Sequence, residues 1–245
     1  MPILEDLIKT ISDEPVDDII IGIYATLICA GECGLSSTLR YGIRPHRPVE
    51  DCGELTGKST GQLAKFLFSD YLIEAGIGMA AINASLPRID SNTPILNAKN
   101  LIYKKGVGKI VALIGHFPFV ENSHEFKELM VFEKFPTEGD LREQDIPFLL
   151  NKADVVAITA TSIPNHTFED ILTHCKGGSY KIVLGPTTPL SPILFDYGID
   201  AISGSIVRDR VLVKRQVKEG ISFKNIGGTD KVTLFKEDYA RKSFG

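Results

Sequence analysis

Five short apolar runs in the second half of the chain are each followed by residue types that suit ligand binding. We expect these runs to be strands, over residues 109–114, 128–132, 155–159, 181–184 and 201–202. The candidate ligand-binding residues in or soon after the loops that follow are Gly115, Phe117, Glu133, Thr159, Thr161, Asn165, Gly185, Pro186, Thr187, Thr188, Gly204 and Ser205. Glycine lets a ligand approach the backbone closely, and hydroxyl groups with free amides at helix starts suit oxyanions or carboxylates. The sequence therefore predicts a small-molecule site made of these loops.

His116 is the candidate catalytic residue, because it follows Gly115 in the first of these loops. An imidazole changes its charge near neutral pH, so a histidine that reaches a ligand can act as a general acid or base. A neighbouring carboxylate such as that of Glu133 would raise the pKa of His116, whereas burial would lower it. No pair among the five histidines has the spacing of metal ligands.

Glu133 follows the second expected strand directly, where nucleotide-binding sheets place an acid on the ribose hydroxyls. In those sheets a glycine-rich turn follows the first strand. Gly115 is instead followed by His-Phe-Pro-Phe, with no second glycine. A dinucleotide is therefore disfavoured, an adenosyl or pterin-like ligand stays open, and no cofactor is assigned.

The cysteines give no specific metal signal. Cys29, Cys33, Cys52 and Cys175 are too few for a disulfide scaffold in 245 residues, and they form no Cys-x-x-Cys pair. We expect all of them to be reduced thiols. Cys29 and Cys33 flank a tight turn but lack third and fourth ligands, so no structural zinc is expected and no metal ligand is assigned. A three-thiol site stays open if Cys52 folds back beside them.

The composition is that of a globular protein, with 43% hydrophobic and 24% charged residues. A formal net charge of −4 provides no basic field for nucleic acid or an anionic membrane surface. No apolar run is long enough to cross a membrane, and the chain does not begin with a basic segment before an apolar run. We therefore expect a cytoplasmic protein that binds a small molecule, without nucleic-acid or membrane partners. Homo-oligomerisation stays open.

The first third of the chain predicts strands followed by helices. The expected elements are a short helix over 4–9, a strand over 18–30, a turn over 31–34, a returning strand over 37–41, and helices over 59–68 and 69–84. Ser59 is a candidate N-cap of the first of these two helices. The second helix has small residues at helical spacing, which permits close packing.

From about residue 107 the pattern changes to strands that alternate with helical segments. These segments are expected near 121–127, 143–152, 166–176, 191–197 and 206–218. The alternation predicts a parallel, doubly wound sheet with both faces covered. Ligands bind such sheets at the carboxyl ends of the strands, where the strand order reverses. Pro87 and Pro94 mark the linker that precedes this half.

Several of these segments together resemble a known family. They are residues 53–59, 74–84, 114–119, 131–134 with Pro136, Gly139 and Asp140, 153–172 and 183–190. The chain resembles bacterial and archaeal proteins of unknown function that carry the label "putative heavy-metal chelation domain". The resemblance implies an α/β protein with a smaller α+β domain like the N-terminal domain of enolase over residues 1–90. A Rossmann-like domain with a parallel sheet is implied over residues 91–245.

The resemblance implies a site between the two domains. The leading hypothesis is a small-molecule-binding protein that acts as an enzyme on a heterocyclic or anionic metabolite linked to metal chelation, such as a pterin, a flavin or a siderophore-like compound. One alternative is a non-catalytic heavy-metal or metallophore binder that uses the cysteines or His116. The other alternative is a methyltransferase-like protein that binds the adenosyl cofactor. The resemblance does not decide whether the chain is an enzyme.

Overall fold

An antiparallel three-stranded sheet and two helices form most of the first half of the computed structural model, which describes residues 2–41, 47–87, 98–117 and 123–242. Its strands pair in the order β1-β2-β3. The elements are α1 (Pro2–Lys9), β1 (Asp18–Ile21), β2 (Ala25–Ala30), β3 (Glu32–Ser37), α2 (Thr60–Ala64) and α3 (Leu72–Ser85). Ser59 caps α2 as predicted: its hydroxyl accepts from Gln62 N, and the Gln62 side chain accepts from Ser59 N.

Two strand predictions in this half are wrong. The run over 18–30 is broken by a turn in which Gly22 N donates to Ala25 O, so it forms two strands. A Cβ at position 22 would lie 2.6 Å from the carbonyl oxygen of Val217 in helix α7 (Arg210–Lys218), so only glycine fits where this helix crosses the turn. The returning strand expected over 37–41 is also misplaced: the turn is confined to Gly31, which has a φ of +73°, and β3 runs from Glu32 to Ser37.

Close packing of α3 on β3 follows from the small residues predicted for this helix. A Cβ added to Gly34 of β3 would lie 2.3 Å from the carbonyl oxygen of Ala80 and 2.2 Å from the amide nitrogen of Ala84. A Cβ added to Gly78 of α3 would likewise lie 2.2 Å from the amide nitrogen of Leu67. The helix can therefore contact the sheet and the preceding turn only because these positions have no side chain.

The second half contains a seven-stranded sheet in the order β10-β9-β8-β7-β4-β5-β6. All neighbouring strands are parallel except the edge pair of β9 and β10. The strands are β4 (Ile110–Ile114), β5 (Glu128–Glu133), β6 (Leu141–Arg142), β7 (Val155–Thr159), β8 (Tyr180–Leu184), β9 (Ala201–Val207) and β10 (Thr229–Phe235). From β6 to β9 the order is that of the Rossmann fold, which confirms the predicted α/β class.

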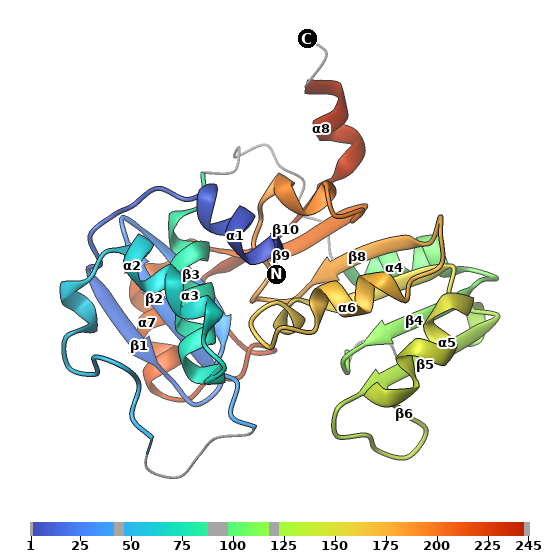
Figure 1. Ribbon diagram of the computed structural model, residues 1–245, viewed down its shortest axis with the longest axis horizontal. Helices are drawn as coiled ribbons and strands as arrows, with labels where there is room; N and C mark the ends of the chain where they lie inside the picture. Colours follow the sequence, from blue (N-terminus) through green and yellow to red (C-terminus); the bar gives the residue numbers. More distant parts are fainter. Residues whose placement is uncertain (1, 42–46, 88–97, 118–122, 243–245) are drawn as a thin grey trace.

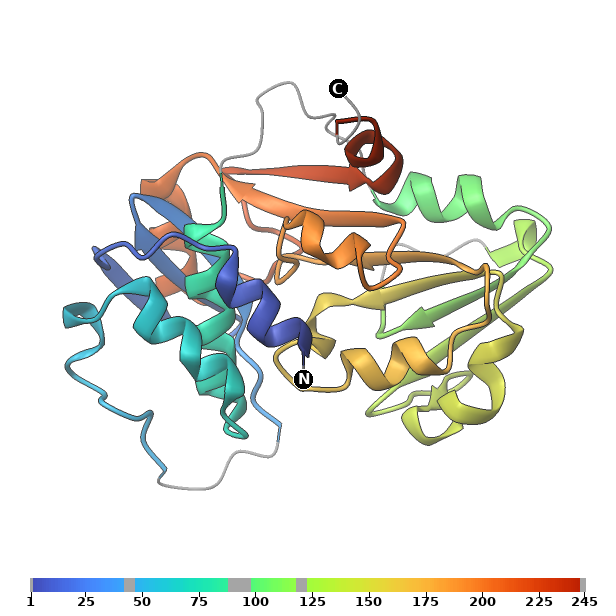
Figure 2. The same cartoon turned by 45° about the horizontal axis from the view of Figure 1, so that its top comes forward.

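Helices cover both faces of this sheet, as Figures 1 and 2 show. They are α4 (Ala98–Gly106), α5 (Ile146–Leu149) and α6 (Phe168–Thr173), whereas α8 (Lys236–Lys242) follows β10 and α7 packs on the three-stranded sheet. Residues of α1, α5 and α6 join one apolar cluster, and those of α4 join another. Ala112 belongs to the first cluster and Val111 to the second, because successive side chains of a strand point to opposite faces.

The end of the sheet differs from the prediction. Residues 201–202 were expected as a short strand, but β9 continues to Val207 because β10 pairs with it over its full length. Gly204 and Ser205 therefore lie inside a strand and not in a loop. The helix expected over 206–218 begins at Arg210, capped by the Asp209 side chain. The predicted linker after Pro87 and part of the helix expected over 121–127 fall outside the described residues.

Each half of the chain supplies a helix to the other. Helix α7 packs against β1 and β2, where Val213 and Val217 join Leu27 and Leu35 in one buried cluster. Helix α1 is buried through Ile3, Leu4 and Leu7 in the large cluster of the Rossmann-like sheet (Figure 2). The two domains are therefore tied together by exchanged helices.

Candidate functional site

The strand order reverses between β4 and β7, and the loops after these two strands touch. A Cβ added to Gly115, which has a φ of +98°, would lie 3.0 Å from Thr159 Cγ2. Gly115 N donates to Phe132 O of β5, so the chain stays hydrogen-bonded to β5 up to Gly115. Open α/β sheets bind their ligands at this position.

A cavity of about 280 Å³ lies at this reversal, and we call it the switch-point cavity. Its lining residues are Tyr41, Ile114, Gly115, His116, Phe132, Glu133, Lys134, Phe135, Glu143, Ile146, Thr159, Thr161, Ser162, Asn165, Thr167 and Ile171. Six of the predicted site residues are among them: Gly115, His116, Glu133, Thr159, Thr161 and Asn165. The ends of β4, β5 and β7 thus bring together side chains from three separate loops.

The residues at the end of β7 and directly after it line one wall of the cavity with hydroxyl groups. The Oγ1 atoms of Thr159 and Thr161 are 3.0 Å apart and hydrogen-bonded to each other. Ser162 Oγ donates to Thr159 O, which tightens the single 3-10 turn over residues 160–162. Hydroxyl groups held in this way can donate to, or accept from, a polar ligand.

The first domain closes this cavity with Tyr41. The Tyr41 hydroxyl accepts a hydrogen bond of 3.0 Å from Asn165 Nδ2, and the Lys134 ammonium lies 4.5 Å from the centre of the Tyr41 ring. Phe135 meets the same ring edge-on, with the centroids 6.0 Å apart. Burial raises the pKa of Tyr41, so this phenol stays protonated at neutral pH. The aromatic wall suits a planar ring, and the lysine adds a positive charge.

Glu133 ends β5 and is partly buried at the cavity wall. Its Oε2 atom accepts from the backbone amide of Lys134 at 3.1 Å. A carboxylate held at the end of the strand next to β4 is placed to accept hydrogen bonds from a sugar diol or from ring N–H groups.

His116 is the most exposed of the predicted site residues, with 59% of its side chain accessible. Its acidic neighbour is Asp140, where Oδ1 lies 4.0 Å from His116 Nδ1, and not the Glu133 suggested by the sequence. Two hydrogen bonds from Thr137, from its amide and its hydroxyl, lower the pKa of Asp140. Asp140 is therefore ionised at neutral pH.

The remaining predicted residues lie elsewhere. Phe117 packs against the cluster on the α4 side of the sheet. Thr187 is buried, accepts from Ser37 N and donates to Ser37 Oγ, so it joins the two domains. Gly204 faces Leu190 and has no room for a ligand. Gly185 and Pro186 lie in the loop before Thr187. They line neither the switch-point cavity nor the second cavity described next.

Thr188 and Ser205 line a second, smaller cavity of about 160 Å³. This cavity lies between β3 and α3 of the first domain and β9 of the second, and it shares no residue with the switch-point cavity. The loops predicted to form one site therefore divide between two.

Sequence reasoning missed Tyr41, Phe135 and Asp140. Lys134 follows Glu133 directly, and its position after a predicted strand was a usable signal. Tyr41 has no comparable signal, because it reaches the cavity from the other domain. Asp140 was noted in the resembling segments, but nothing in its spacing relates it to His116.

The expectation of four reduced thiols is wrong for one pair. Cys29 and Cys33 are joined by a disulfide, because they face each other across the β2–β3 register. Cys52 and Cys175 are free; Cys52 is exposed, and burial raises the pKa of Cys175 to about 11. Within the described part of the chain, no three His, Cys, Asp or Glu side chains are grouped as metal ligands. A site shared by Cys29, Cys33 and Cys52 does not form.

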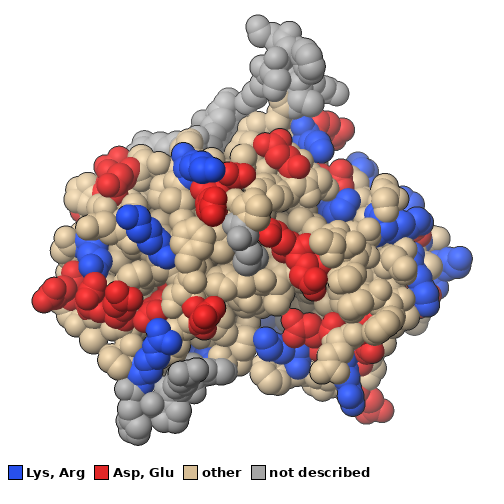
Figure 3. All heavy atoms as spheres, viewed as in Figure 1, with Lys and Arg blue, Asp and Glu red and all other residues tan. Residues whose placement is uncertain are grey.

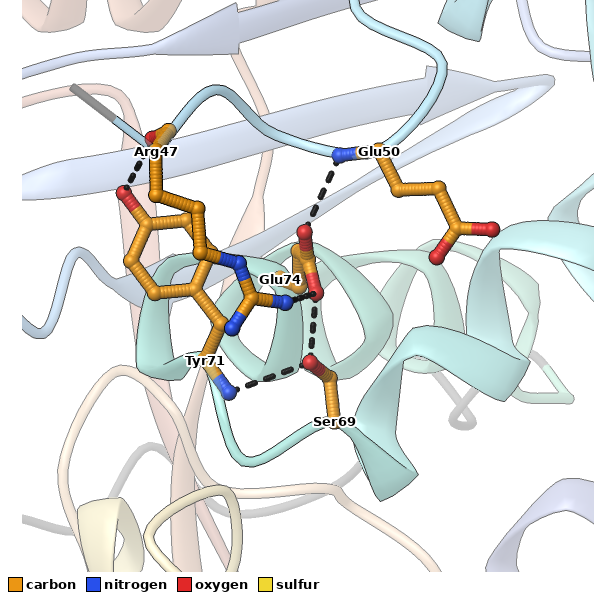
Figure 4. Close-up of polar contacts among 5 residues, drawn as sticks. All are labelled: Arg47, Glu50, Ser69, Tyr71 and Glu74. Carbon is orange, nitrogen blue, oxygen red and sulfur yellow. Dashed lines mark hydrogen bonds and ion pairs between the residues drawn. The ribbon is translucent and has the colours of Figure 1, made fainter. Parts of the chain in front are cut away.

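A buried carboxylate fixes residues 47–50 of the first domain (Figure 4). Glu74 of α3 has only 2% of its side chain exposed, and it accepts from Ser69 Oγ, Glu50 N and Arg47 Nη2. The Arg47 guanidinium also stacks on the Tyr71 ring at 4.5 Å, and the Tyr71 hydroxyl donates to Arg47 O. Residues 47–50 are thereby held on the start of α3.

Charge on the surface is mixed. In the view of Figure 3, acidic and basic side chains are interspersed, and no single sign covers the face. None of the helices in the described ranges has the length and apolar character needed to span a bilayer.

Fold and site together define a two-domain α/β protein whose Rossmann-like sheet has a cavity at its strand reversal. Two family models match the chain, over residues 4–86 and 98–236, and both are described as "putative heavy-metal chelation". The chain belongs to this family.

Relatives agree with this assignment. An uncharacterized protein of Methanocaldococcus jannaschii is 29% identical over 185 residues, which cover 72% of this chain and 70% of that protein. A DUF364-family protein of unknown function from Desulfitobacterium hafniense has a similar crystal structure, with a TM-score of 0.81 and 28% identity over 96% of this chain and 97% of its own. A DUF364-family structure from Pyrococcus horikoshii matches in fold, with a TM-score of 0.80 and 22% identity over 95% and 98%.

Proposed function

We propose that the protein binds a small heterocyclic or anionic metabolite in the switch-point cavity and acts on it as an enzyme. The single observation that carries this proposal is the convergence of the ends of β4, β5 and β7 with Tyr41 around one cavity of about 280 Å³. The lining combines apolar side chains, such as those of Ile114 and Phe132, with a larger number of polar groups that can fix the orientation of a ligand.

The chemistry of the walls selects the ligand class. Tyr41 and Phe135 offer aromatic surface to a planar ring, and the Lys134 ammonium, which lies 4.0 Å from Glu143 Oε2, can also contact an anionic group. Thr159 and Thr161 offer hydroxyl groups. A planar heterocycle that carries an acidic or phosphate substituent satisfies these groups together, whereas a purely apolar ligand would leave them unpaired.

His116 is the candidate acid or base. It is accessible at the mouth of the cavity, and the ionised Asp140 carboxylate lies 4.0 Å from its Nδ1 atom. In this arrangement His116 donates a proton to a bound metabolite and recovers it from solvent.

Only Glu133 favours the adenosyl-cofactor alternative. It ends the strand next to β4, and Rossmann-type nucleotide sites have an acidic residue at this position. A metal-binding role through Cys29 and Cys33 is not supported, because these sulfurs are bonded to each other.

The test uses protein purified without added ligands. Native mass spectrometry of this protein, followed by thermal-shift measurements with pterins, flavins, nucleotides and the adenosyl cofactor, should identify a compound that binds saturably. Thr161→Val and Glu133→Gln should weaken that binding at least tenfold. Binding that is unchanged in both variants, or the absence of binding by any of these compounds, would contradict the proposal.

Catalysis is tested separately with His116→Gln. This variant should bind the identified compound but lose turnover, with little change in melting temperature, because the side chain is exposed. His174→Gln is the matched control, since His174 has a similar ion-pair contact with Asp170 on the surface of α6. Equal activity of both variants would remove His116 from the mechanism.

A further inference from the structure

Two residues that line the second cavity, between the two domains, each have a buried polar atom without a hydrogen-bond partner. We call it the interdomain cavity; it has a volume of about 160 Å³, and its lining includes Asn83, Thr188, Ser205 and Arg208. Among the described residues, three buried side-chain atoms have no hydrogen-bond partner: Asn83 Oδ1, Thr188 Oγ1 and Ser179 Oγ. Two of the three belong to residues that line this one cavity.

The orientation of the Asn83 amide is fixed by its partners. Asn83 Nδ2 donates to Leu35 O at 2.8 Å and to Thr187 O at 3.1 Å. Both partners are carbonyl oxygens, which only accept, so the nitrogen must be the atom that faces them. Asn83 Oδ1 is therefore an acceptor without a donor, and a donor group from outside the chain would satisfy it.

Thr188 is the second such group. Only 2% of the residue is exposed, and its backbone amide is already used in a bond to Gly185 O. Its hydroxyl can donate as well as accept. A buried hydroxyl without a partner destabilises the folded chain, so a threonine here is unfavourable unless something pairs with it.

A cation lies on the same lining. The Arg208 side chain is 49% exposed, and its Nε donates to Asp230 Oδ2 at 2.7 Å. That bond uses one edge of the guanidinium, and the Nη groups can still donate to a carboxylate. Ser205 adds a further hydroxyl on this side.

We propose that the interdomain cavity binds a small molecule that carries both an N–H donor group and a carboxylate, namely a free α-amino acid. The ammonium group donates to Asn83 Oδ1, the carboxylate accepts from Arg208, and the Thr188 hydroxyl pairs with either group. The proposal is independent of the switch-point cavity, since the two linings have no residue in common. The bound molecule would bridge the two domains, because Asn83 belongs to α3 and Thr188 follows β8.

The experiment measures thermal shifts of the full chain with each of the common α-amino acids, with calorimetric titration of any that bind. At least one should bind saturably, and its amine and its carboxylic acid analogues, each lacking one of the two groups, should bind at least tenfold more weakly. Arg208→Ala should weaken binding by a similar factor. Arg210→Ala is the matched control, because Arg210 is also paired with an aspartate, Asp17, but does not line the cavity.

The Thr188→Val variant distinguishes two explanations of the unpaired Thr188 hydroxyl: that it binds a ligand, or that it is hydrogen-bonded to water. Without ligand this variant should be at least as stable as the parent, because an unpaired hydroxyl is replaced by a methyl group of similar size. With ligand it should bind more weakly. The proposal is overturned if no amino acid binds, if binding persists unchanged in Arg208→Ala, or if Thr188→Val is destabilised without ligand. Weaker binding in Glu133→Gln would likewise overturn it, by placing the ligand in the other cavity.

Discussion

The hydroxyl of Tyr41 accepts a hydrogen bond of 3.0 Å from the amide of Asn165, although the two residues belong to different domains. Tyr41 follows the three-stranded sheet, and Asn165 lies between β7 and α6 of the Rossmann-like sheet. The switch-point cavity is therefore composite, since one wall comes from each domain. The relative position of the groups that line it depends on the contact between the domains.

Replacement of Gly34 by alanine should destabilise the protein strongly. The new Cβ would lie 2.2 Å from Ala84 N and 2.3 Å from Ala80 O, and backbone atoms at these distances must move. We expect a loss of about 3 kcal/mol in the free energy of unfolding, measured by urea denaturation. Gly57→Ala is the control, because a Cβ there meets nothing within 4 Å. Equal stability of the two variants would show that α3 and β3 are not in such close contact.

Removal of the buried Glu74 carboxylate should have a comparable effect. Glu74→Ala leaves Ser69 Oγ, Glu50 N and Arg47 without their acceptor, and we expect a cost of about 3 kcal/mol. Glu50→Ala is the control, because the exposed Glu50 contributes only its backbone amide to this network. Denaturation curves that coincide for both variants would contradict a structural role for the carboxylate.

Thiol labelling should distinguish three classes of cysteine. In the native protein an alkylating reagent should modify Cys52 alone, because Cys175 is partly buried and its pKa is raised to about 11. Denaturation without reductant should expose Cys175 as well, and reduction should release Cys29 and Cys33. Intact mass spectrometry counts the added groups. Labelling of all four cysteines in denatured, unreduced protein would rule out the disulfide.

The pKa of Asp140 predicts one component of the pH dependence of stability. Because its folded-state pKa is lowered by Thr137, the carboxylate stabilises the fold above the ordinary carboxyl pKa. This contribution is lost as the pH falls through the lowered value. Asp140→Asn should therefore be less stable than the parent at pH 7, by about 1–2 kcal/mol, and the difference should vanish in acid. Asp196→Asn, at an exposed position, serves as the control. A constant difference at every pH would indicate a packing effect.

The parts of the fold that depend on local pattern were predictable from the sequence. The strand from Val155 to Thr159 and the cap at Ser59 follow from apolar runs and capping chemistry, and both match the structure. Strand β10 was missed because an edge strand that pairs on one side only has a weak pattern, and without it Gly204 was placed in a loop.

The candidate site was predictable only where it depends on strand ends. Gly115, Glu133 and Thr159 meet because parallel strands share an edge. The contributions of Tyr41 and Asp140 depend on distant contacts that no spacing reveals. The pairing of Cys29 with Cys33 depends on the register of a hairpin whose turn is shorter than the sequence suggested.

The position of α7 has a consequence for protein synthesis. The face of the β1–β3 sheet that carries Leu27 and Leu35 is covered by Val213 and Val217, near the far end of the chain. While the ribosome makes the intervening residues, the nascent first domain lacks this cover and exposes an apolar surface that can aggregate. The first domain can therefore complete its folding only after α7, from the second half of the chain, has left the ribosome. Chaperones that bind apolar segments can act before that time.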